Sequence, residues 1–160
     1  MGEKNIYVDV MITALRKKVE ILERLEQAVF TETNVLKKSQ VTIEEIEATE
    51  DDKAKALEEL EKADEGFEQV YNRVKDELQS DRFKYEEEIK TMQGLIRTIT
   101  DCTTKIQAQE IRNKQLMEYF LQAKKNEVRA FKRKYNATAQ YTSHLPNRET
   151  GRSYFLDNKK

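Results

Sequence analysis

Apolar residues recur at every seventh position in the first part of the chain. The series begins at Val8 and continues without a gap through Leu15, Leu22, Val29, Leu36 and Ile43. A repeat of seven places its members along one stripe of an α-helix, as in coiled coils, whereas a strand needs a period of two. This spacing predicts a long helix over residues 5–39 that buries one face against other helices.

Two further helices are expected from the same pattern. The second is predicted over residues 43–79 and opens with a capping box, in which Thr42 and Glu45 each bond to the other's backbone amide. Glu50 and Lys53 interrupt its apolar seam. The third is predicted over residues 82–135. Its seam consists of Tyr85, Ile89, Met92, Leu95, Ile96, Ile99, Cys102, Ile106, Gln109, Asn113, Leu116 and Phe120.

The break between the second and third helices rests on one polar run, Gln79 to Arg82, which contains neither Gly nor Pro. Ser80 or Asp81 is expected to cap the third helix. Without a turn, residues 50–135 would form a single helix well over about 100 Å long, and the protein would be a coiled coil of several chains. We favour the turn, because the first two helices then pair end to end.

The predicted fold is all-α, an antiparallel bundle of three long helices with coiled-coil packing over residues 1–135. The third helix exceeds the other two in length, so its C-terminal part is expected to overhang the bundle as an amphipathic helix. Residues 136–160 contain the one Pro of the chain and many polar residues, which is typical of a flexible basic tail.

Composition argues against catalysis. The chain has 160 residues but one Cys and one His, too few for a Cys-based zinc site, for the two Glu-x-x-His motifs of di-iron bundles or for the His-Glu-x-x-His motif of metalloproteases. Cys102 lies in a helix seam and is expected to be buried and inert, while His144 lies in the tail. We therefore expect no enzyme, no metal and no cofactor. One unpaired thiol and the absence of an export signal indicate the cytoplasm.

The net charge of −1 hides two opposite ends. Residues 44–68 carry 12 acidic and 3 basic side chains, whereas residues 124–160 carry 10 basic and 3 acidic ones. The simpler interpretation is that charged faces solvate long helices. The functional alternative is that the basic end meets an acidic partner or folds back on the acidic middle. The acidic segment argues against binding of nucleic acid or insertion into a membrane.

An amphipathic segment near the C-terminal end is the main candidate site. Leu116, Phe120, Val128, Phe131 and Tyr135 fall on one helical face, with basic residues mostly on the other. On an overhanging helix this apolar face has no partner within the chain, so it is expected to bind a helix of another protein. The alternatives are that it folds back on the bundle or pairs in a homodimer.

Gln109 and Asn113 are polar residues at seam positions. One interpretation is that their buried amides fix the register of the helices. The other is that they line a groove where a partner's backbone forms hydrogen bonds.

Several local stretches resemble the FlgN-type flagellar export chaperones. The similar stretches are Leu57 to Leu60 leading into Ala63 to Phe67 and Tyr71 to Val74, then Ile106 to Asn113 with its Glu-x-x-Asn, and the ending Ser153 to Lys160. The resemblance extends over essentially the whole chain.

The resemblance implies a function that is not catalytic. Such chaperones are cytoplasmic proteins that bind the C-terminal helices of hook-associated junction proteins, prevent premature assembly and deliver them to the flagellar type III export gate. We expect client contact at Gln109, Asn113 and the amphipathic face, and docking to the cytoplasmic part of the gate at Tyr154 and Phe155. The alternative is a structural or adaptor coiled coil, such as the stalk of the export ATPase.

Overall fold

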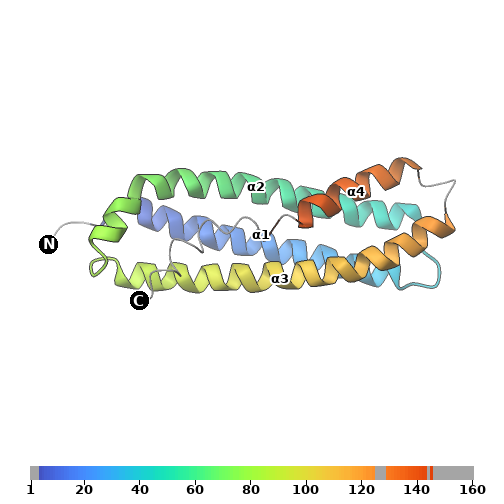
Figure 1. Cartoon of the computed structure of the whole chain (residues 1–160), viewed down its shortest axis with the longest axis horizontal. Coiled ribbons are helices and arrows are strands. Elements are labelled where there is room, and N and C mark those ends of the chain that lie inside the picture. The colour runs from blue at the N-terminus through green and yellow to red at the C-terminus, as the bar shows by residue number, and fades with distance from the viewer. Residues whose placement is uncertain (1–3, 125–128, 144, 146–160) are drawn as a thin grey trace.

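The computed structural model describes residues 4–124, 129–143 and 145, and for 129–132 the helical backbone alone. These residues form four helices and no strand. The helices are α1 (Ile6–Leu36), α2 (Ile43–Ser80), α3 (Glu86–Ala123) and α4 (Arg129–Ser143). The three long helices lie side by side, each running opposite to the one before it, and α4 lies beside α2 and α3 (Figure 1). The all-helical fold is therefore confirmed, while coiled-coil packing stays a prediction.

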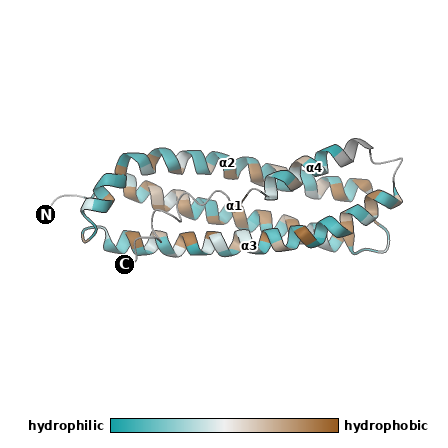
Figure 2. Cartoon of the chain, in the orientation of Figure 1, coloured by the Kyte–Doolittle hydropathy of each residue, from teal (hydrophilic) through white to brown (hydrophobic). Residues whose placement is uncertain are grey.

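The apolar seams meet in three clusters along the bundle. Each long helix alternates between hydrophobic and hydrophilic residues along its length (Figure 2), as the helical period requires. One cluster joins Val8 of α1 to Val74 of α2 and Met92 of α3, and a second joins Leu25, Leu60 and Ile106. The third, at the end where α1 meets α2, contains Ile46, Met117, Phe120, Leu121 and Tyr135.

The beginnings of α1 and α2 follow from local sequence. The side chain of Asn5 accepts a hydrogen bond from the Tyr7 amide at 2.9 Å. The predicted capping box of α2 is confirmed, since Thr42 Oγ1 accepts from the Glu45 amide at 3.2 Å and the Glu45 carboxylate accepts from the Thr42 amide at 3.4 Å. Each cap satisfies amide groups that the first helical turn leaves without partners.

A turn separates α2 from α3, as the polar run predicted. The prediction that Ser80 or Asp81 caps α3 is wrong, because Asp81 ends α2 and Ser80 donates back to the Asp76 carbonyl. The α3 helix instead begins after Tyr85, which is fully buried and whose hydroxyl accepts from the Asn5 amide at 2.8 Å. A buried aromatic anchor that ties the turn to the start of α1 thus takes the place of a polar cap.

The expected overhanging helix does not occur. The prediction of one helix over residues 82–135 is wrong, because α3 ends at Ala123 and α4 packs back against α2 and α3. Phe120 and Tyr135, predicted to share an exposed stripe, are 8% and 3% exposed in the third cluster. Folding back removes this apolar surface from water, which an overhang would leave exposed. Helix α4 also continues to Ser143, so residues 136–143 are helical rather than part of a tail.

Candidate functional site

The inner face of α4 is narrow and largely polar in composition. Among its described side chains, Tyr135, Thr138 and Thr142 are buried, and Ala139 is half-buried. The two threonine hydroxyls donate to carbonyls one turn earlier in α4 itself, at 3.1 and 3.0 Å. Each hydroxyl is therefore satisfied within α4 and needs no partner on α2 or α3. Tyr135 is the one large side chain, among those described, that α4 buries against the bundle.

Beneath Tyr135 lies a buried group of four charged side chains, which we call the charged cluster: Glu32 of α1, Glu50 and Lys53 of α2, and Glu110 of α3. Lys53 is fully buried, and its Nζ lies 2.8 Å from Glu32, 2.9 Å from Glu50 and 3.2 Å from Glu110. The Tyr135 ring lies over the same ammonium, with its centroid 5.7 Å from Nζ. All four helices therefore meet at a single cation.

One ammonium cannot balance three carboxylates in a buried site, and the pKa values reflect this imbalance. Burial, together with the neighbouring Glu32, raises the pKa of Glu50 to about 8. Burial raises the pKa of Glu110 to about 7, although Lys53 opposes the shift. Burial also acts to raise the pKa of Glu32, but hydrogen bonding with Glu50 and the charge of Lys53 hold it below its ordinary value. Near neutral pH the cluster therefore keeps Glu32 ionised and holds a proton on Glu50.

Next to the charged cluster, Gln109 and Asn113 hold α3 to α1. The Asn113 amide donates to the Val29 carbonyl and to Glu32, both at 3.0 Å, while its oxygen accepts from Thr33 at 2.7 Å. Gln109 donates to Thr33 at 2.9 Å. Asn113 is fully buried, and all these partners lie within the bundle. The geometry thus favours the interpretation that these amides fix helix register.

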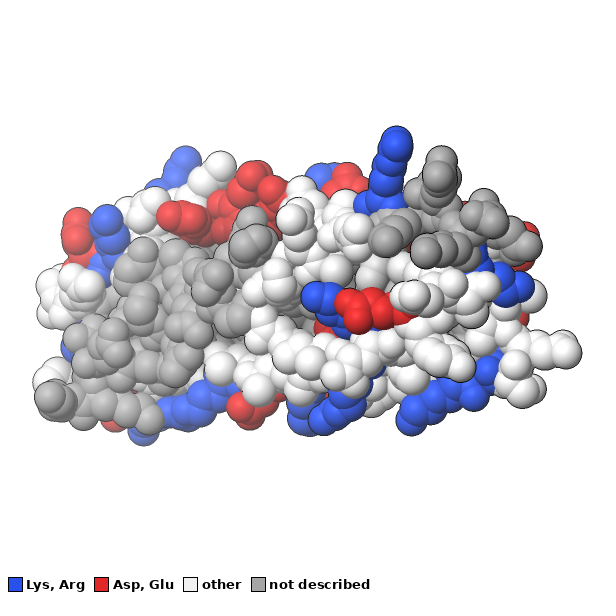
Figure 3. All heavy atoms as spheres, turned by 45° about the vertical axis from the view of Figure 1, so that its right-hand side comes forward, with Lys and Arg blue, Asp and Glu red and all other residues white. Residues whose placement is uncertain are grey.

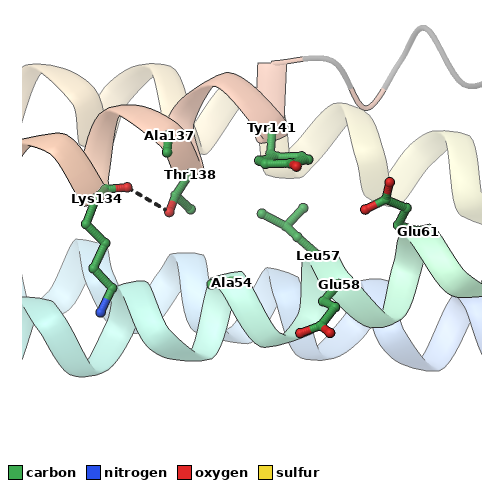
Figure 4. Close-up of a pocket in the computed structure, with 8 residues that line it drawn as sticks. All are labelled: Ala54, Leu57, Glu58, Glu61, Lys134, Ala137, Thr138 and Tyr141. Atoms are coloured by element: carbon green, nitrogen blue, oxygen red, sulfur yellow. Dashed lines mark hydrogen bonds between the residues drawn. The ribbon is translucent and has the colours of Figure 1, made fainter.

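Helix α4 leaves open space on both of its sides. A cavity of about 330 Å³ lies between α4 and α2, where Thr138 and Tyr141 point toward Leu57 (Figure 4). A larger one of about 660 Å³ lies between α4 and α3, lined in part by Glu110 and Ile111. Lys134 reaches across to α2 and pairs with Asp51 at an exposed position. The seat of α4 is therefore wider than the helix that occupies it.

The predicted site residues fall into three groups. Phe120 and Tyr135 meet in the third apolar cluster, with Leu116 half-buried on α3. Gln109 and Asn113 lie inside the bundle. Phe131 is part of α4, but its side chain lies outside the described residues, as do Val128, Tyr154 and Phe155 altogether.

Sequence reasoning missed the charged cluster. It treated Glu50 and Lys53 as interruptions of the seam, although Ile46, Glu50, Lys53 and Leu57 follow the alternating spacing of four and three residues that marks a buried stripe. Opposite charges at two consecutive seam positions were the signal that could have found it.

The sequence profile of the FlgN family, described as FlgN protein, matches residues 1–144. The chain belongs to the FlgN family. This is the flagellar export chaperone family, so a chaperone role in flagellar export follows for this FlgN protein. Comparison with curated proteins and with solved structures gave no match.

Two negative findings apply to the described part of this FlgN protein. No helix there is long and apolar enough to cross a membrane. No group of three or more His, Cys, Asp or Glu side chains in the same part could hold a metal ion.

Proposed function

We propose that this FlgN protein binds the C-terminal amphipathic helix of hook-associated junction proteins in the cytoplasm. In this proposal it keeps these subunits from assembling early and delivers them to the flagellar type III export gate. Membership of the FlgN family supports the chaperone role, and the seat of α4 supports the mode of binding.

The observation that carries the proposal is the position of α4. A short helix with one anchoring aromatic residue, Tyr135, lies in a groove between α2 and α3 that is wider than the helix. A groove that accepts one amphipathic helix has the dimensions and the apolar floor to accept another. Client binding would then use a surface that the free chain covers with its own segment.

The proposed client contacts are Leu116, Phe120, Val128, Phe131 and Tyr135. Phe120 and Tyr135 are buried in the same cluster, so a client reaches Phe120 only after α4 has left its seat. Val128, Phe131 and Tyr135 would then contact the client from the displaced segment. Gln109 and Asn113 are proposed as positioning residues, since their amides hold α3 against α1. Gate docking is proposed for Tyr154 and Phe155, and a homodimer through α4 is the competing use of the same apolar face.

Co-purification with tagged junction proteins tests this function. The wild-type chain should form a complex with a subunit that retains its C-terminal helix and none with a subunit truncated before it. The double variant Leu116→Ala with Phe120→Ala, both on α3, should weaken the complex at least about tenfold, because two apolar contacts of the groove are lost. Tyr135→Ala should instead tighten the complex, because α4 loses its anchor and leaves the groove more readily.

Tyr119→Ala is the matched control, since Tyr119 is 82% exposed on α3 and should not affect binding. Normal or tighter binding by the double variant would contradict the assignment of Leu116 and Phe120 as client contacts. Failure of every junction protein to bind the wild-type chain would contradict the function itself.

A further inference from the structure

Among the described side chains, Lys53 is the one cation of the charged cluster. Three carboxyl groups converge on Lys53, and two of them, on Glu32 and Glu50, are buried as completely as the lysine. Glu50 Oε1 lies 2.9 Å from the ammonium, whereas Oε2 is buried and accepts no hydrogen bond. With one ammonium shared by three buried carboxyl groups, Glu50 stays protonated in the free chain, and a second cationic donor would allow it to ionise.

Helix α4 covers the cluster without supplying that donor from its described side chains. Tyr135 lies over Lys53 and presents a ring rather than a charge. The two described basic residues of α4 point elsewhere, since Lys134 pairs with Asp51 and Arg133 is exposed. Figure 3 shows acidic and basic side chains on the visible surface of the molecule, whereas the charged cluster lies in the interior.

The apolar fit of α4 is also incomplete. Its buried face combines Tyr135 with Thr138 and Thr142, and the cavities on its two sides hold about 330 and 660 Å³. A helix with Leu, Ile or Met in place of the threonines would fill more of this space and remove more apolar surface from water.

We propose that the surface of α2 and α3 beneath α4, the α4 seat, binds a partner helix that carries a Lys or Arg in the middle of its apolar face. The cation would occupy the position that Tyr135 takes in the free chain and donate to Glu50 and Glu110. This inference rests on the proposed function, because it specifies the client helix that the same site selects.

Charge balance supports the replacement of Tyr135 by a cation of the partner helix. The groups facing the site are Glu32 from α1, Glu50 and Lys53 from α2, Glu110 from α3 and Tyr135 from α4. In the free chain the imbalance is met by a proton held on Glu50, whose pKa lies at about 8. When a second cation arrives, that proton passes to the buffer and both oxygens of Glu50 become acceptors. Binding therefore releases about one proton for each complex formed near pH 7.

Two synthetic amphipathic peptides of equal length test the proposal. They carry Leu or Ile at helical spacing and differ at the central apolar position, which is Arg in one and Met in the other. Calorimetric titration into the full chain at pH 7 should give at least about tenfold tighter binding of the Arg peptide, the discrimination expected of a buried charge pair. Repeating the titration in phosphate and in Tris should show release of about one proton with the Arg peptide and none with the Met peptide.

Glu50→Gln removes the charge while keeping the shape of the protonated side chain, and it should abolish both the preference and the proton release. Glu20→Gln, an exposed carboxylate on α1 outside the α4 seat, is the matched control and should preserve them. Equal binding of the two peptides, binding of neither, or a preference that survives Glu50→Gln would overturn the proposal. Capture of junction proteins by the wild-type chain would then still stand as a separate result.

Discussion

At the scale of single residues, Glu50 and Glu110 make stability depend on pH in an unusual direction. Their pKa values of about 8 and 7 in the folded chain lie above the ordinary value of 4.5. Between pH 4.5 and 8 the folded chain therefore binds more protons than the unfolded chain, so the free energy of unfolding falls as the pH rises. Glu32, whose pKa is lowered, acts in the opposite sense below about pH 4.5.

We expect urea denaturation to give a free energy of unfolding about 1 to 3 kcal/mol lower at pH 8 than at pH 5.5. Glu50→Gln should reduce this dependence, because glutamine cannot titrate, while Glu110 still contributes its share. Glu58→Gln, with its parent side chain 70% exposed, should leave the dependence unchanged. Stability that rises over this range, or an unaltered slope in Glu50→Gln, would contradict the assigned protonation of the cluster.

The same residues mark the limit of what the sequence could predict about the site. Gln109 and Asn113 are recognisable as buried amides, because an uncharged amide at a seam position is readily buried once it forms hydrogen bonds between helices. Glu50 and Lys53 escape recognition, since charged residues are almost never fully buried unless paired. Their partners, Glu32 and Glu110, lie on other helices. The apolar pattern within each helix does not show which charged side chains will face each other across the bundle.

At the scale of helices, α4 is the element least firmly held. The described part of α4 buries one large side chain, Tyr135, and its ion pair from Lys134 to Asp51 is exposed. Exposed ion pairs contribute little, and threonines bury little apolar surface. Helix α1, by contrast, buries Ile21, Leu22 and Leu25 almost completely.

Hydrogen exchange should therefore detect opening of α4 without global unfolding. Amides of residues 133–143 should exchange at least about a hundredfold faster than those of residues 21–29, because local opening is less costly than global unfolding. Thr138→Val should slow exchange in α4 by adding apolar surface, whereas Thr104→Val, an exposed change on α3, should not. Equal protection of α4 and α1 would show that α4 is a fixed part of the bundle.

The helices themselves were predictable where local chemistry specifies them. Local residues explain three of the helix boundaries. These are the cap at Asn5, the capping box at Thr42 and the polar run that begins at Gln79. The end of α3 at Ala123 carries none, as neither Gly nor Pro occurs between Lys124 and Val128. At that break the chain turns back onto the third apolar cluster, which forms where α1 ends and α2 begins.

At the scale of the whole molecule, opposite charges are brought together by the fold. The acidic segment of residues 44–68 lies in α2, and α4 with its basic residues packs against that helix. The sequence left open whether the basic end meets a partner or folds back on the acidic middle. For α4 the structure favours folding back, through the pair of Lys134 with Asp51, so a client would compete with a charge match already present in the chain.

The turn at residues 81–85 makes the overall dimensions a test between the chaperone and the stalk-like coiled coil. With the turn, the longest helix has 38 residues and is about 57 Å long. A continuous helix from α2 through α3 would instead be about 120 Å long, with a radius of gyration near 35 Å. Small-angle scattering of the monomeric full chain should give a radius of gyration below about 25 Å, since three helices share one length. As a control, insertion of Gly-Gly at Phe83, which is 95% exposed in the turn, should leave the compact radius of gyration unchanged. A radius of gyration near that of the rod would contradict the turn and favour the structural coiled coil.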